Sequence, residues 1–387
     1  MRPELPVSDS YDVIVIGLGA MGSAAARALA ARDVRVLGLE QFGPAHALGA
    51  SHGRSRIIRL AYYEDPSYVP LLRTTFDLWA RLEREFGQQL VTRCGALFMG
   101  PPGGEVYGGT LGAAGQHGLD HEDLDAAQIR SRYDVLRPGG GLRGVHEDIA
   151  GIVVPELGVQ AQIDGARKAG ADLMFDTAVE SWDADGSGVA VRTRSGSYRA
   201  QHLILAPGAW APRLLHLPDL PLRVERRLQL WFAPTARHDD FAALPVWMWE
   251  RLDGLVFYGL PLRDGACKVA THNRGEVCDP DTVDRSIRPD EVAYMREVLR
   301  DSVPDLAGGE LVQGSACTYT LTPDLHFVVG AHPEQDRVSI ACGFSGHGFK
   351  FAPVMGEVLA DLALDGRTEH PIGLFDPKRL LGASSGG

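Results

Sequence analysis

One glycine-rich segment constrains the fold of this chain more than any other part of the sequence. Residues 17–22 read Gly-Leu-Gly-Ala-Met-Gly and follow the apolar run Val-Ile-Val-Ile at 13–16. An apolar run without alternation is typical of a parallel strand that is buried on both faces. The alanine-rich residues 23–32 come next and have high helix propensity. A strand, G-x-G-x-x-G and a helix in this order predict the Rossmann-type unit that binds a dinucleotide.

Each glycine of this segment has a separate task in such a unit. Gly17 allows the tight turn, Gly19 lets backbone amides approach a pyrophosphate, and Gly22 lets the helix and the strand pack closely. The anion would lie at the positive end of the helix dipole.

The residues after the helix support the same interpretation. A second strand predicted at 34–39 ends at Glu40, where a carboxylate can accept hydrogen bonds from ribose hydroxyls. A glycine-rich turn of another α/β protein is the first alternative. A membrane helix over 13–29 is the second, but Arg27 and the three glycines interrupt that apolar span, which is barely long enough to cross a bilayer.

The length of the chain and one later segment predict how the domains are arranged. With 387 residues the chain is long for one hydrophobic core, so two domains are expected. Residues 203–210 (Leu-Ile-Leu-Ala-Pro-Gly-Ala-Trp) indicate a buried strand that ends in a glycine turn and returns to the first sheet. We therefore predict a discontinuous dinucleotide-binding domain of residues 1–85, 148–217 and 316–387, and a substrate domain of residues 86–147 and 218–315.

Composition narrows the partners and the compartment. The formal net charge of −12 disfavours nucleic acid or an anionic membrane surface as a partner. Five cysteines without CxxC spacing fit a reducing cytoplasm, and the first ten residues lack the basic start and apolar core of a signal peptide. The terminal Ser-Ser-Gly-Gly is no peroxisomal tripeptide. We predict a cytoplasmic protein, and the 13 histidines show no spacing that indicates a metal site.

A basic segment follows the second predicted strand. Residues 51–59 read Ser-His-Gly-Arg-Ser-Arg-Ile-Ile-Arg. A solvated basic loop is the simplest interpretation of such a run. This run, however, lies just beyond the carboxyl end of a nucleotide-binding strand, where ligands collect in doubly wound sheets. The position favours a functional segment.

Three further features could contribute to chemistry. Residues 343–350 (Gly-Phe-Ser-Gly-His-Gly-Phe-Lys) lie between a predicted strand at 338–341 and a predicted helix at 353–364, so a second helix dipole could face an electron-rich ligand. Lys268 and His272 are four residues apart in a predicted strand and would share a face, where a buried lysine needs a partner. A lone cysteine such as Cys317 is more often an inert buried residue than a reactive one.

Taken together, these segments resemble one known family. In order and with similar spacings, residues 17–22, 51–59, Lys268 with His272, residues 317–319 (Cys-Thr-Tyr) and residues 343–350 are similar to segments of the monomeric sarcosine oxidase and N-methyltryptophan oxidase family, within the D-amino acid oxidase-like superfamily. The resemblance implies a mixed α/β (α+β) fold, with a Rossmann-like FAD-binding domain and an inserted antiparallel-sheet substrate domain. It also implies a monomeric oxidase that converts secondary N-methyl amino acids such as sarcosine to imines, and then to aldehyde and amine, while dioxygen becomes hydrogen peroxide.

The resemblance also implies roles for individual residues. Cys317 matches the position at which the family attaches FAD covalently, and Lys268 matches a lysine that activates dioxygen, where a fixed cation stabilises superoxide. Arg59 and Lys350 match the pair that binds the substrate carboxylate. The residues expected to act in catalysis are Lys268, Arg56, His272 and Tyr319. Those expected to bind the cofactor are Gly17, Gly19, Ala20, Met21, Gly22, Glu40, His52, Arg56, Val179, Cys317, Gly343, Gly346, Gly348 and Lys350.

Some positions depart from the family pattern. Family members often have a tyrosine where this chain has Phe257, before Tyr258, and a histidine where it has Leu60. Family members often read His-His-Gly-Asp-Thr-Arg at the positions where this chain reads Ser-His-Gly-Arg-Ser-Arg, residues 51–56. The loss of polar groups favours a substrate with a bulkier or more apolar side chain than sarcosine. Three tryptophans of the inserted domain could shape such a pocket, although core packing is expected for at least two of them: Trp231, Trp247 and Trp249.

Other functions remain open at this point. An oxidase of cyclic imino acids such as pipecolate or proline is the nearest alternative, because a ring nitrogen is also a secondary amine. A flavin dehydrogenase that passes electrons to a quinone is a second alternative. A flavoprotein subunit that binds without turnover is a third, but it would have no need of an oxygen-activating lysine.

Overall fold

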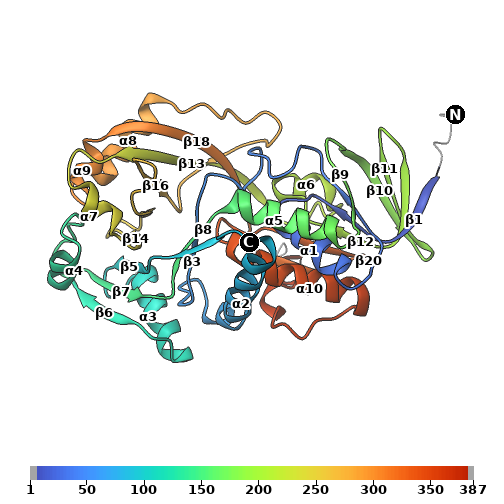
Figure 1. Ribbon diagram of the computed structural model, residues 1–387, viewed down its shortest axis with the longest axis horizontal. Helices are drawn as coiled ribbons and strands as arrows, with labels where there is room; N and C mark the ends of the chain where they lie inside the picture. The colour runs from blue at the N-terminus through green and yellow to red at the C-terminus, as the bar shows by residue number, and fades with distance from the viewer. Residues whose placement is uncertain (1–6, 382–387) are drawn as a thin grey trace.

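The computed structural model describes residues 7–381, and two lobes stand side by side in it (Figure 1). One lobe contains the amino-terminal strand β1 (Val7–Ile16), and the other contains the long strands β13 (Arg223–Ala233) and β18 (Glu310–Leu321). Residues 1–6 and 382–387 lie outside the described range, so the predictions that rest on the two chain ends concern residues that the structure does not describe.

The first sheet contains the predicted dinucleotide-binding unit. Its central strands are parallel: β1 pairs with β2 on one side and with β12 on the other, and Ile14 lies opposite Leu37 and Leu203. The predicted return of residues 203–210 to this sheet is therefore confirmed. The spatial order is β10 (Val179–Asp185), β11 (Gly188–Thr193), β12 (Ser197–Leu205), β1, β2 (Val36–Leu39) and β9 (Asp172–Met174), while β20 (Gln335–Cys342) pairs with both β12 and β19 (Val328–His332).

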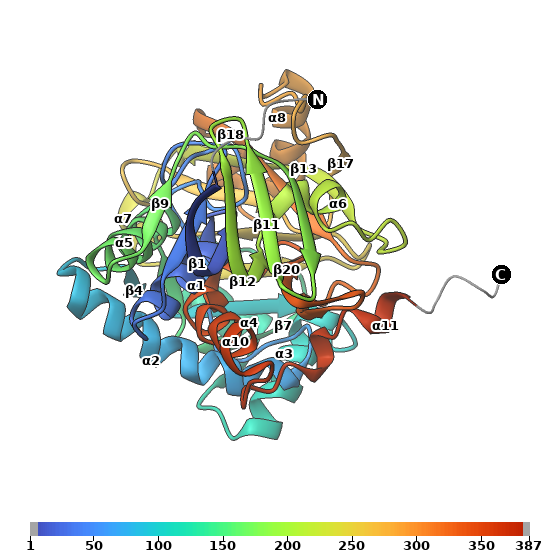
Figure 2. The same cartoon turned by 90° about the vertical axis from the view of Figure 1, so that its right-hand side faces the viewer.

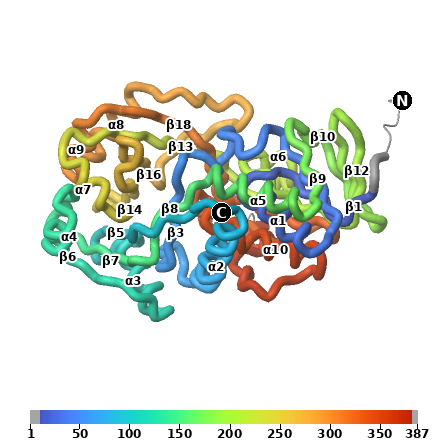
Figure 3. Tube along the Cα trace, in the orientation of Figure 1, coloured from blue at the N-terminus to red at the C-terminus, as the bar shows by residue number. Residues whose placement is uncertain are grey.

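Segments that are far apart in the chain meet in this sheet. Figure 2 shows β1, β12, β11 and β20 across its face, and the tube in Figure 3 shows the first, middle and last parts of the chain side by side. The outer strands β10 and β11 run antiparallel. This arrangement follows from the sequence because residues 13–16, 36–39 and 203–205 are buried on both faces, as expected for central strands.

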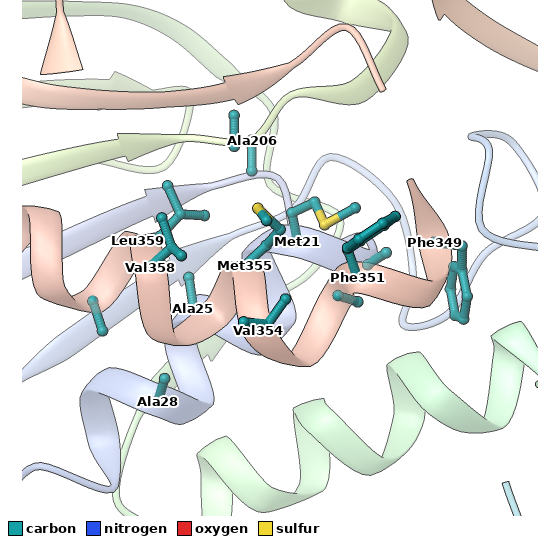
Figure 4. Packing of buried hydrophobic residues seen from close by; sticks show 14 of the residues in the cluster. Met21, Ala25, Ala28, Ala206, Phe349, Phe351, Val354, Met355, Val358 and Leu359 are labelled. Atoms are coloured by element: carbon teal, nitrogen blue, oxygen red, sulfur yellow. The ribbon is translucent and has the colours of Figure 1, made fainter. Parts of the chain in front are cut away.

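Helices cover one face of the first sheet, and the small alanine side chains of the first helix let the neighbouring helices pack close to it. Helix α1 (Ala20–Ala30) begins earlier than the predicted 23–32, directly after Gly19. It packs against α5 (Pro155–Lys168) and α10 (Ala352–Asp365). Figure 4 shows Met21, Ala25 and Ala28 of α1 facing Val354, Met355, Val358 and Leu359 of α10. A Cβ at Gly356 would lie 2.7 Å from the backbone of Ala24, so a larger residue would force the two helices apart.

The second sheet forms the other lobe and is largely antiparallel, as predicted. Its order is β17 (Glu276–Val277), β13, β16 (Cys267–Thr271), β15 (Val256–Gly259), β14 (Val246–Glu250), β5 (Ala96–Gly100), β7 (Arg143–Glu147) and β6 (Glu122–Asp125), with β18 on the free side of β13. One pair, β5 with β14, is parallel and so departs from the prediction. At this pair two segments far apart in the chain meet without a hairpin to set their direction. The domain boundaries themselves stay a prediction, and β18 continues past residue 315 to Leu321.

The core of the second lobe accounts for two of the tryptophans. Trp247 and Trp249 are buried with Phe257 in one hydrophobic cluster, and the ring of Trp249 stacks on that of Phe257. Alternation along β14 turns Met248 to the opposite face of the sheet. The prediction that at least two of the tryptophans pack in the core is therefore confirmed.

A small third sheet joins the two lobes. It consists of β3 (Arg56–Ile58), β8 (Gly151–Val153) and β4 (Val91–Arg93), and both pairings are antiparallel. In Figure 1, β3 and β8 lie at the centre of the molecule, between the lobes. The remaining elements are α2 (Val69–Phe86), α3 (Glu105–His117), α4 (Ala126–Arg132), α6 (Ala211–Leu214), α7 (His238–Ala242), α8 (Pro289–Leu299), α9 (Pro304–Ala307), α11 (Lys378–Leu381), η1 (Pro66–Tyr68), η2 (Gly208–Trp210), η3 (Phe349–Phe351) and η4 (Gly373–Phe375).

The apolar span at 13–29 is divided between β1 and α1, so the membrane-helix interpretation is wrong. Among residues 7–381, none of the helices combines the length and apolar character needed to span a bilayer.

Candidate active site

A long cavity follows the carboxyl ends of the parallel strands of the first sheet. Its volume is about 170 Å³. Its walls come from five segments, at 16–21, 39–41, 45–51, 206–210 and 341–349. This is the edge of a doubly wound sheet at which ligands are expected.

The glycines of the predicted motif form one end of this cavity. Gly17 has a φ of +85°, and a Cβ there would lie 2.4 Å from the carbonyl oxygen of Ala206. A Cβ at Gly22 would lie 1.7 Å from the oxygen of Gly17. Helix α1 starts after Gly19 and points its first amides toward the cavity, and the Ala20 N–H donates to Ser51 Oγ at 3.3 Å. A pyrophosphate fits this cradle, because Gly17 and Gly19 line it without side chains and the helix dipole favours an anion.

Glu40 lines the same cavity at the end of β2, as predicted. Its side chain is 5% exposed and is oriented by two backbone amides. Oε2 accepts from Leu18 N at 2.8 Å, and Oε1 accepts from Phe42 N at 3.1 Å. A carboxylate has about four lone-pair positions, so acceptor capacity remains for the hydroxyls of a ribose. The residues present therefore fit a dinucleotide such as FAD.

A second, smaller cavity adjoins the first. Its volume is about 50 Å³, and it shares Arg56, Tyr319, Gly346 and Phe349 with the larger cavity. The rest of its wall comes from Ser55, Ile57, Arg59, Glu64, Met248, Tyr258, Leu260, His272, His347 and Lys350. A small ligand held here would face the end of a cofactor held in the larger cavity.

A buried ion pair stands in the wall of the small cavity. Arg59 is 2% exposed and pairs with the carboxylate of Glu64. Burial alone would raise the pKa of Glu64, but the charge of Arg59 overrides it and holds the pKa at about 2. The Arg59 guanidinium also lies 4.0 Å from the ring centroid of Tyr62 and 4.4 Å from that of Tyr63. Aromatic faces and a carboxylate thus keep this buried cation in place.

Lys350 supplies a second cation to the same cavity. Its Nζ donates to the His347 carbonyl oxygen at 2.7 Å and to the Tyr62 hydroxyl at 3.2 Å. Burial and then the charge of Arg59 lower the pKa of Lys350 to about 7, against the opposing effect of Glu64. The Lys350 ammonium would gain from an anion in the cavity, since a bound anion favours its charged form.

The small cavity also contains a neutral imidazole, two tyrosine hydroxyls and the guanidinium of Arg56. Burial lowers the pKa of His272 to about 4, so its imidazole is neutral. Tyr258 and Tyr319 hydrogen-bond to each other, and burial raises the pKa of both hydroxyls. Arg56 reaches the wall shared by the two cavities while its guanidinium donates to the carbonyl oxygens of Ser55 and Ala50 at 2.8 and 2.6 Å.

Lys268 lies behind this wall. It is 3% exposed, and its Nζ donates to the carbonyl oxygens of Gly53 and Ser55 at 3.0 and 2.8 Å. An ammonium has three N–H groups, so one is left for a water or another small acceptor. His52 is close by, and its pKa is lowered to about 3, first by burial and then by the charges of Arg56 and Lys268.

Some predicted residues do not form the cavity walls. Among the described residues, the walls of the two cavities do not include Gly22, His52, Val179, Lys268 and Cys317. Gly22 acts through helix packing, and His52, Lys268 and Cys317 lie buried one layer back. Val179 begins β10, pairs with Thr193 and packs with the apolar residues of the first sheet.

Two cysteines differ in their position relative to the larger cavity, because Cys342 lines it and Cys317 does not. Cys317 is 1% exposed in β18, opposite Arg227 of β13. Cys342, at the end of β20, lines the larger cavity. Burial raises the pKa of the Cys342 thiol to about 12, so this thiol is a weak nucleophile before any cofactor is bound.

Sequence reasoning did not single out three residues of the small cavity, Glu64, Met248 and Leu260. Glu64 follows Arg59 through a loop without periodicity, so nothing in the sequence pairs them. Met248 could have been found, because its two tryptophan neighbours in β14 face the core and alternation turns Met248 to the cavity.

The buried histidines predict acid sensitivity. Burial is the main cause that lowers the pKa to about 3 for His52 and His347 and to about 4 for His202 and His272. Below pH 6.5 the unfolded chain takes up these protons and the folded chain does not. Each histidine then removes about 1.4 kcal/mol of unfolding free energy per pH unit until its folded pKa is reached. The part of the stability that depends on these histidines is expected to be complete above pH 6.5 and to fall steeply toward pH 4.

Urea unfolding of the holoprotein at pH 7.5, 6.0 and 5.0 measures this slope. Burial raises the pKa of Glu147 to about 7, so this carboxyl binds its proton more readily in the folded chain and makes stability rise as the pH falls. The four histidines outweigh this single group. His202 is remote from both cavities. The variant His202→Asn should reduce the slope of unfolding free energy against pH by the contribution of one proton, about 1.4 kcal/mol per pH unit. A free energy that stays constant between pH 7.5 and 5.0 would contradict the burial of neutral imidazoles.

The fold and the two joined cavities define a class of protein. A Rossmann-type cradle for a dinucleotide that adjoins a small cavity lined by two buried cations is the arrangement of a flavoprotein oxidoreductase for a small anionic substrate. Comparison with known proteins gives the same class. The family model described as DAO, FAD dependent oxidoreductase, matches residues 12–362. The chain belongs to this family, and within it to the group of monomeric sarcosine oxidases and N-methyltryptophan oxidases.

Individual relatives cover almost the whole chain. A protein of Streptomyces avermitilis named monomeric sarcosine oxidase is 46% identical over 383 residues, which are 97% of this chain and 100% of that protein. A protein of Yersinia pestis named N-methyl-L-tryptophan oxidase is 32% identical, over 96% of this chain and 99% of that protein. The solved structure of NikD, described as an unusual amino acid oxidase essential for nikkomycin biosynthesis, has a TM-score of 0.83 and 25% identity, over 96% and 98% of the two chains. The predicted family, fold class and FAD requirement are thereby confirmed.

Proposed function

We propose that this protein is an FAD-dependent oxidase of small secondary amino acids, with sarcosine or a similar N-methyl amino acid as substrate. The products would be an imine, which hydrolyses to aldehyde and amine, and hydrogen peroxide. One observation carries the proposal: Arg59 and Lys350 stand together in a small buried cavity that shares its wall with the dinucleotide cavity. The relatives named sarcosine oxidase and N-methyl-L-tryptophan oxidase support the same reaction class.

FAD, when bound, supplies the chemistry that accepts a hydride from the substrate carbon beside nitrogen and returns the electrons to dioxygen. The residues of the chain bind and orient the substrate. Arg59 and Lys350 are placed to bind its carboxylate, and Glu64 must then share or yield the guanidinium. Binding of the carboxylate at this point places the rest of a small amino acid against Arg56 and Tyr319, in the wall that the two cavities share.

His272 acts on the amine end of the substrate. Because its imidazole is neutral, it can accept a hydrogen bond from the substrate N–H without repelling a cation. Hydride loss requires the unprotonated amine, and a site that already contains Arg56, Arg59 and Lys350 disfavours a further positive charge.

Lys268 is proposed to act in the oxygen step. Two of its N–H groups are used by backbone carbonyl oxygens, so the ammonium has a fixed direction and one free donor. A fixed cation stabilises the negative charge that forms when dioxygen takes its first electron.

The size of the cavity bears on the side chain of the substrate. A volume of about 50 Å³, closed on one side by Met248 and Leu260, favours a substrate with little or no side chain. The departures at Leu60 and Phe257 had favoured a bulkier one. Phe257 is buried in the core of the second lobe, and Leu60 packs in the core of the first, so neither loss of a polar group enlarges the cavity.

Peroxide production in air tests the proposed function. The panel is sarcosine, larger N-methyl amino acids, proline, pipecolate and the matching primary amino acids. Turnover is expected with secondary amines and is expected to fall as the side chain grows. Preference for proline or pipecolate would favour the cyclic imino acid alternative. Flavin bleaching by sarcosine without peroxide would favour a dehydrogenase.

Covalent attachment of FAD through Cys317 is proposed from the family position. The variant Cys317→Ser should keep the fold, because serine is of similar size, but should lose its yellow colour on acid precipitation, whereas the wild-type pellet should stay yellow. Cys342→Ser is the matched variant, because Cys342 lines the cofactor cavity and the pellet should remain yellow. A reversal of the two results would assign the bond to Cys342.

Two further properties are proposed. The relatives named monomeric sarcosine oxidase support a monomer, and cytoplasmic localisation remains a proposal from composition. Gel filtration of the holoprotein tests the first, and fractionation of the source cells tests the second.

A further inference from the structure

The β3–β8 pair lies between the lobes (Figure 1). A carboxylate stands beyond each end of this pair; that of Glu147 is buried and that of Glu156 is half-buried. Arg56 pairs with Val153, and Ile58 pairs with Gly151. Because the two strands are antiparallel, Glu156 lies beyond one end of the pair and Glu147 beyond the other. Each carboxylate accepts hydrogen bonds from two consecutive backbone amides of the segment that contains the predicted catalytic cations.

Glu156 holds the peptide that holds Lys268. Its Oε1 accepts from Gly53 N at 2.6 Å and from Arg54 N at 3.0 Å. The Gly53 carbonyl oxygen in turn accepts from Lys268 Nζ at 3.0 Å. Gly53 and Arg54 both have positive φ values, of +99° and +62°. A non-glycine residue rarely adopts that conformation unless its surroundings impose it, and Glu156 is the side chain that does so here.

Glu147 holds the backbone N–H of Ala61, the residue whose carbonyl oxygen holds Arg59. The side chain is 1% exposed, and its two oxygens accept from Leu60 N and Ala61 N, each at 3.0 Å. The Ala61 carbonyl oxygen accepts from Arg59 Nη1 at 3.0 Å. Ala61 is therefore fixed from both sides, and its position sets the direction of the guanidinium.

We propose that Glu156 and Glu147 are positioning residues for two separate steps of the reaction. Glu156 acts through Gly53 and Lys268 on the reaction of the reduced enzyme with dioxygen, and Glu147 acts through Ala61 and Arg59 on the binding of the substrate carboxylate. The inference rests on the proposed function for the meaning of the two steps.

Charge strengthens both effects. A hydrogen bond from an amide to a carboxylate is stronger than one to a neutral acceptor. The carboxylate of Glu156 also opposes the lowering of the Lys268 pKa by burial, so it helps to keep the ammonium charged. Its replacement by glutamine would keep the shape of the side chain and remove the charge. At position 147, where both oxygens are used, an amide would place an N–H group against a backbone N–H.

The test compares three glutamate-to-glutamine variants of the holoprotein at pH 8. Glu156→Gln and Glu147→Gln remove the two proposed carboxylates. Glu83→Gln is the matched control, because Glu83 Oε1 accepts from Leu90 N and Val91 N at 2.8 and 2.9 Å, outside both cavities. Two measurements are made on each protein. One is the rate of reoxidation by dioxygen after reduction with dithionite, and the other is the Kd of methoxyacetate, an unreactive analogue with an ether oxygen in place of the amine, by calorimetry.

A split between the two measurements is expected. Glu156→Gln should slow reoxidation about tenfold or more and leave the Kd within about twofold of wild type, while Glu147→Gln should do the reverse. Glu83→Gln should change neither value. If both glutamate variants change both quantities alike, or if neither changes either, the proposal is overturned. A wild-type protein that does not bind methoxyacetate overturns the part that concerns Glu147.

Two provisions keep the test decisive. Melting temperature and the flavin spectrum identify a variant that has not folded. The corresponding Glu→Asp variant, which keeps the charge but shortens the reach, then replaces it and must show the same split. Neither measurement uses an amine, so a wild-type enzyme that fails to oxidise sarcosine would refute the proposed function while the split still decides the roles of Glu156 and Glu147.

Discussion

Replacement of Lys268 by methionine is expected to slow the reaction of the reduced enzyme with dioxygen by a factor on the order of 10²–10³, the loss typical for removal of one fixed donor from a developing charge. Reduction of the enzyme by substrate should change far less, because Lys268 lies one layer behind the wall of the substrate cavity. Stopped-flow absorbance measures both steps separately, the first after anaerobic reduction and the second on mixing with substrate without oxygen.

Stability separates this effect from damage to the fold. Methionine matches the length of lysine and removes a buried cation, whose desolvation is costly, so the melting temperature should hold or rise. The ring of Trp231, 5.5 Å from Lys268 Nζ, would still pack against the side chain. Equal slowing of both steps would refute the role of Lys268 in the oxygen reaction.

Replacement of Arg59 by methionine should raise the Kd for a carboxylate ligand by a factor on the order of 10²–10³ and should also destabilise the fold. The first effect follows because a charge-assisted pair in a small buried cavity is lost, and Lys350 alone remains. The second follows because Glu64 is left buried without its partner, which typically costs about 3–5 kcal/mol. Calorimetric titration with methoxyacetate measures the first effect, and urea unfolding measures the second.

A double variant distinguishes the two consequences. Glu64→Gln combined with Arg59→Met removes the unpaired charge, so much of the stability should return while carboxylate binding stays lost. Binding that returns with stability would show that Arg59 acts only by supporting the fold. Arg59→Lys should bind with intermediate affinity, because an ammonium keeps the charge but cannot make the bidentate contact.

The parts of the site that sequence reasoning predicted are those encoded within a few neighbouring residues. The turn at Gly17 and Gly22 and the carboxylate of Glu40 lie on one βαβ unit, so spacing alone places them around a pyrophosphate and a ribose. Residues 51–59 and 343–350 could be singled out because basic or glycine-rich runs stand out locally. Their meeting in one small cavity was expected only through the resemblance to a known family.

Other parts had no local signal. Glu64 pairs with Arg59 across a loop, and Glu147 and Glu156 reach the 53–61 segment from about 90–100 positions later in the chain. Carboxylates that accept from backbone amides leave no pattern in the sequence, because the amide partner can belong to any residue except proline. The position of Cys342 on the cofactor cavity was equally unpredictable, since it depends on which face of β20 the folded sheet turns toward the ligand.

The sequence by itself determined that this chain builds a dinucleotide-binding unit, that the unit is assembled from separated segments, and that the protein is an FAD-dependent amine oxidoreductase of a known family. The first two conclusions follow from local periodicity and glycine geometry, and the third follows from the resemblance of the ordered motifs to a known family. Only the tertiary structure decided that the substrate cavity is small, that Arg59 is paired with Glu64, and that Lys268 is held by two carbonyl oxygens behind the cavity wall. These properties depend on distances between residues far apart in the chain, and burial converts those distances into charge states and free energies that no local pattern records.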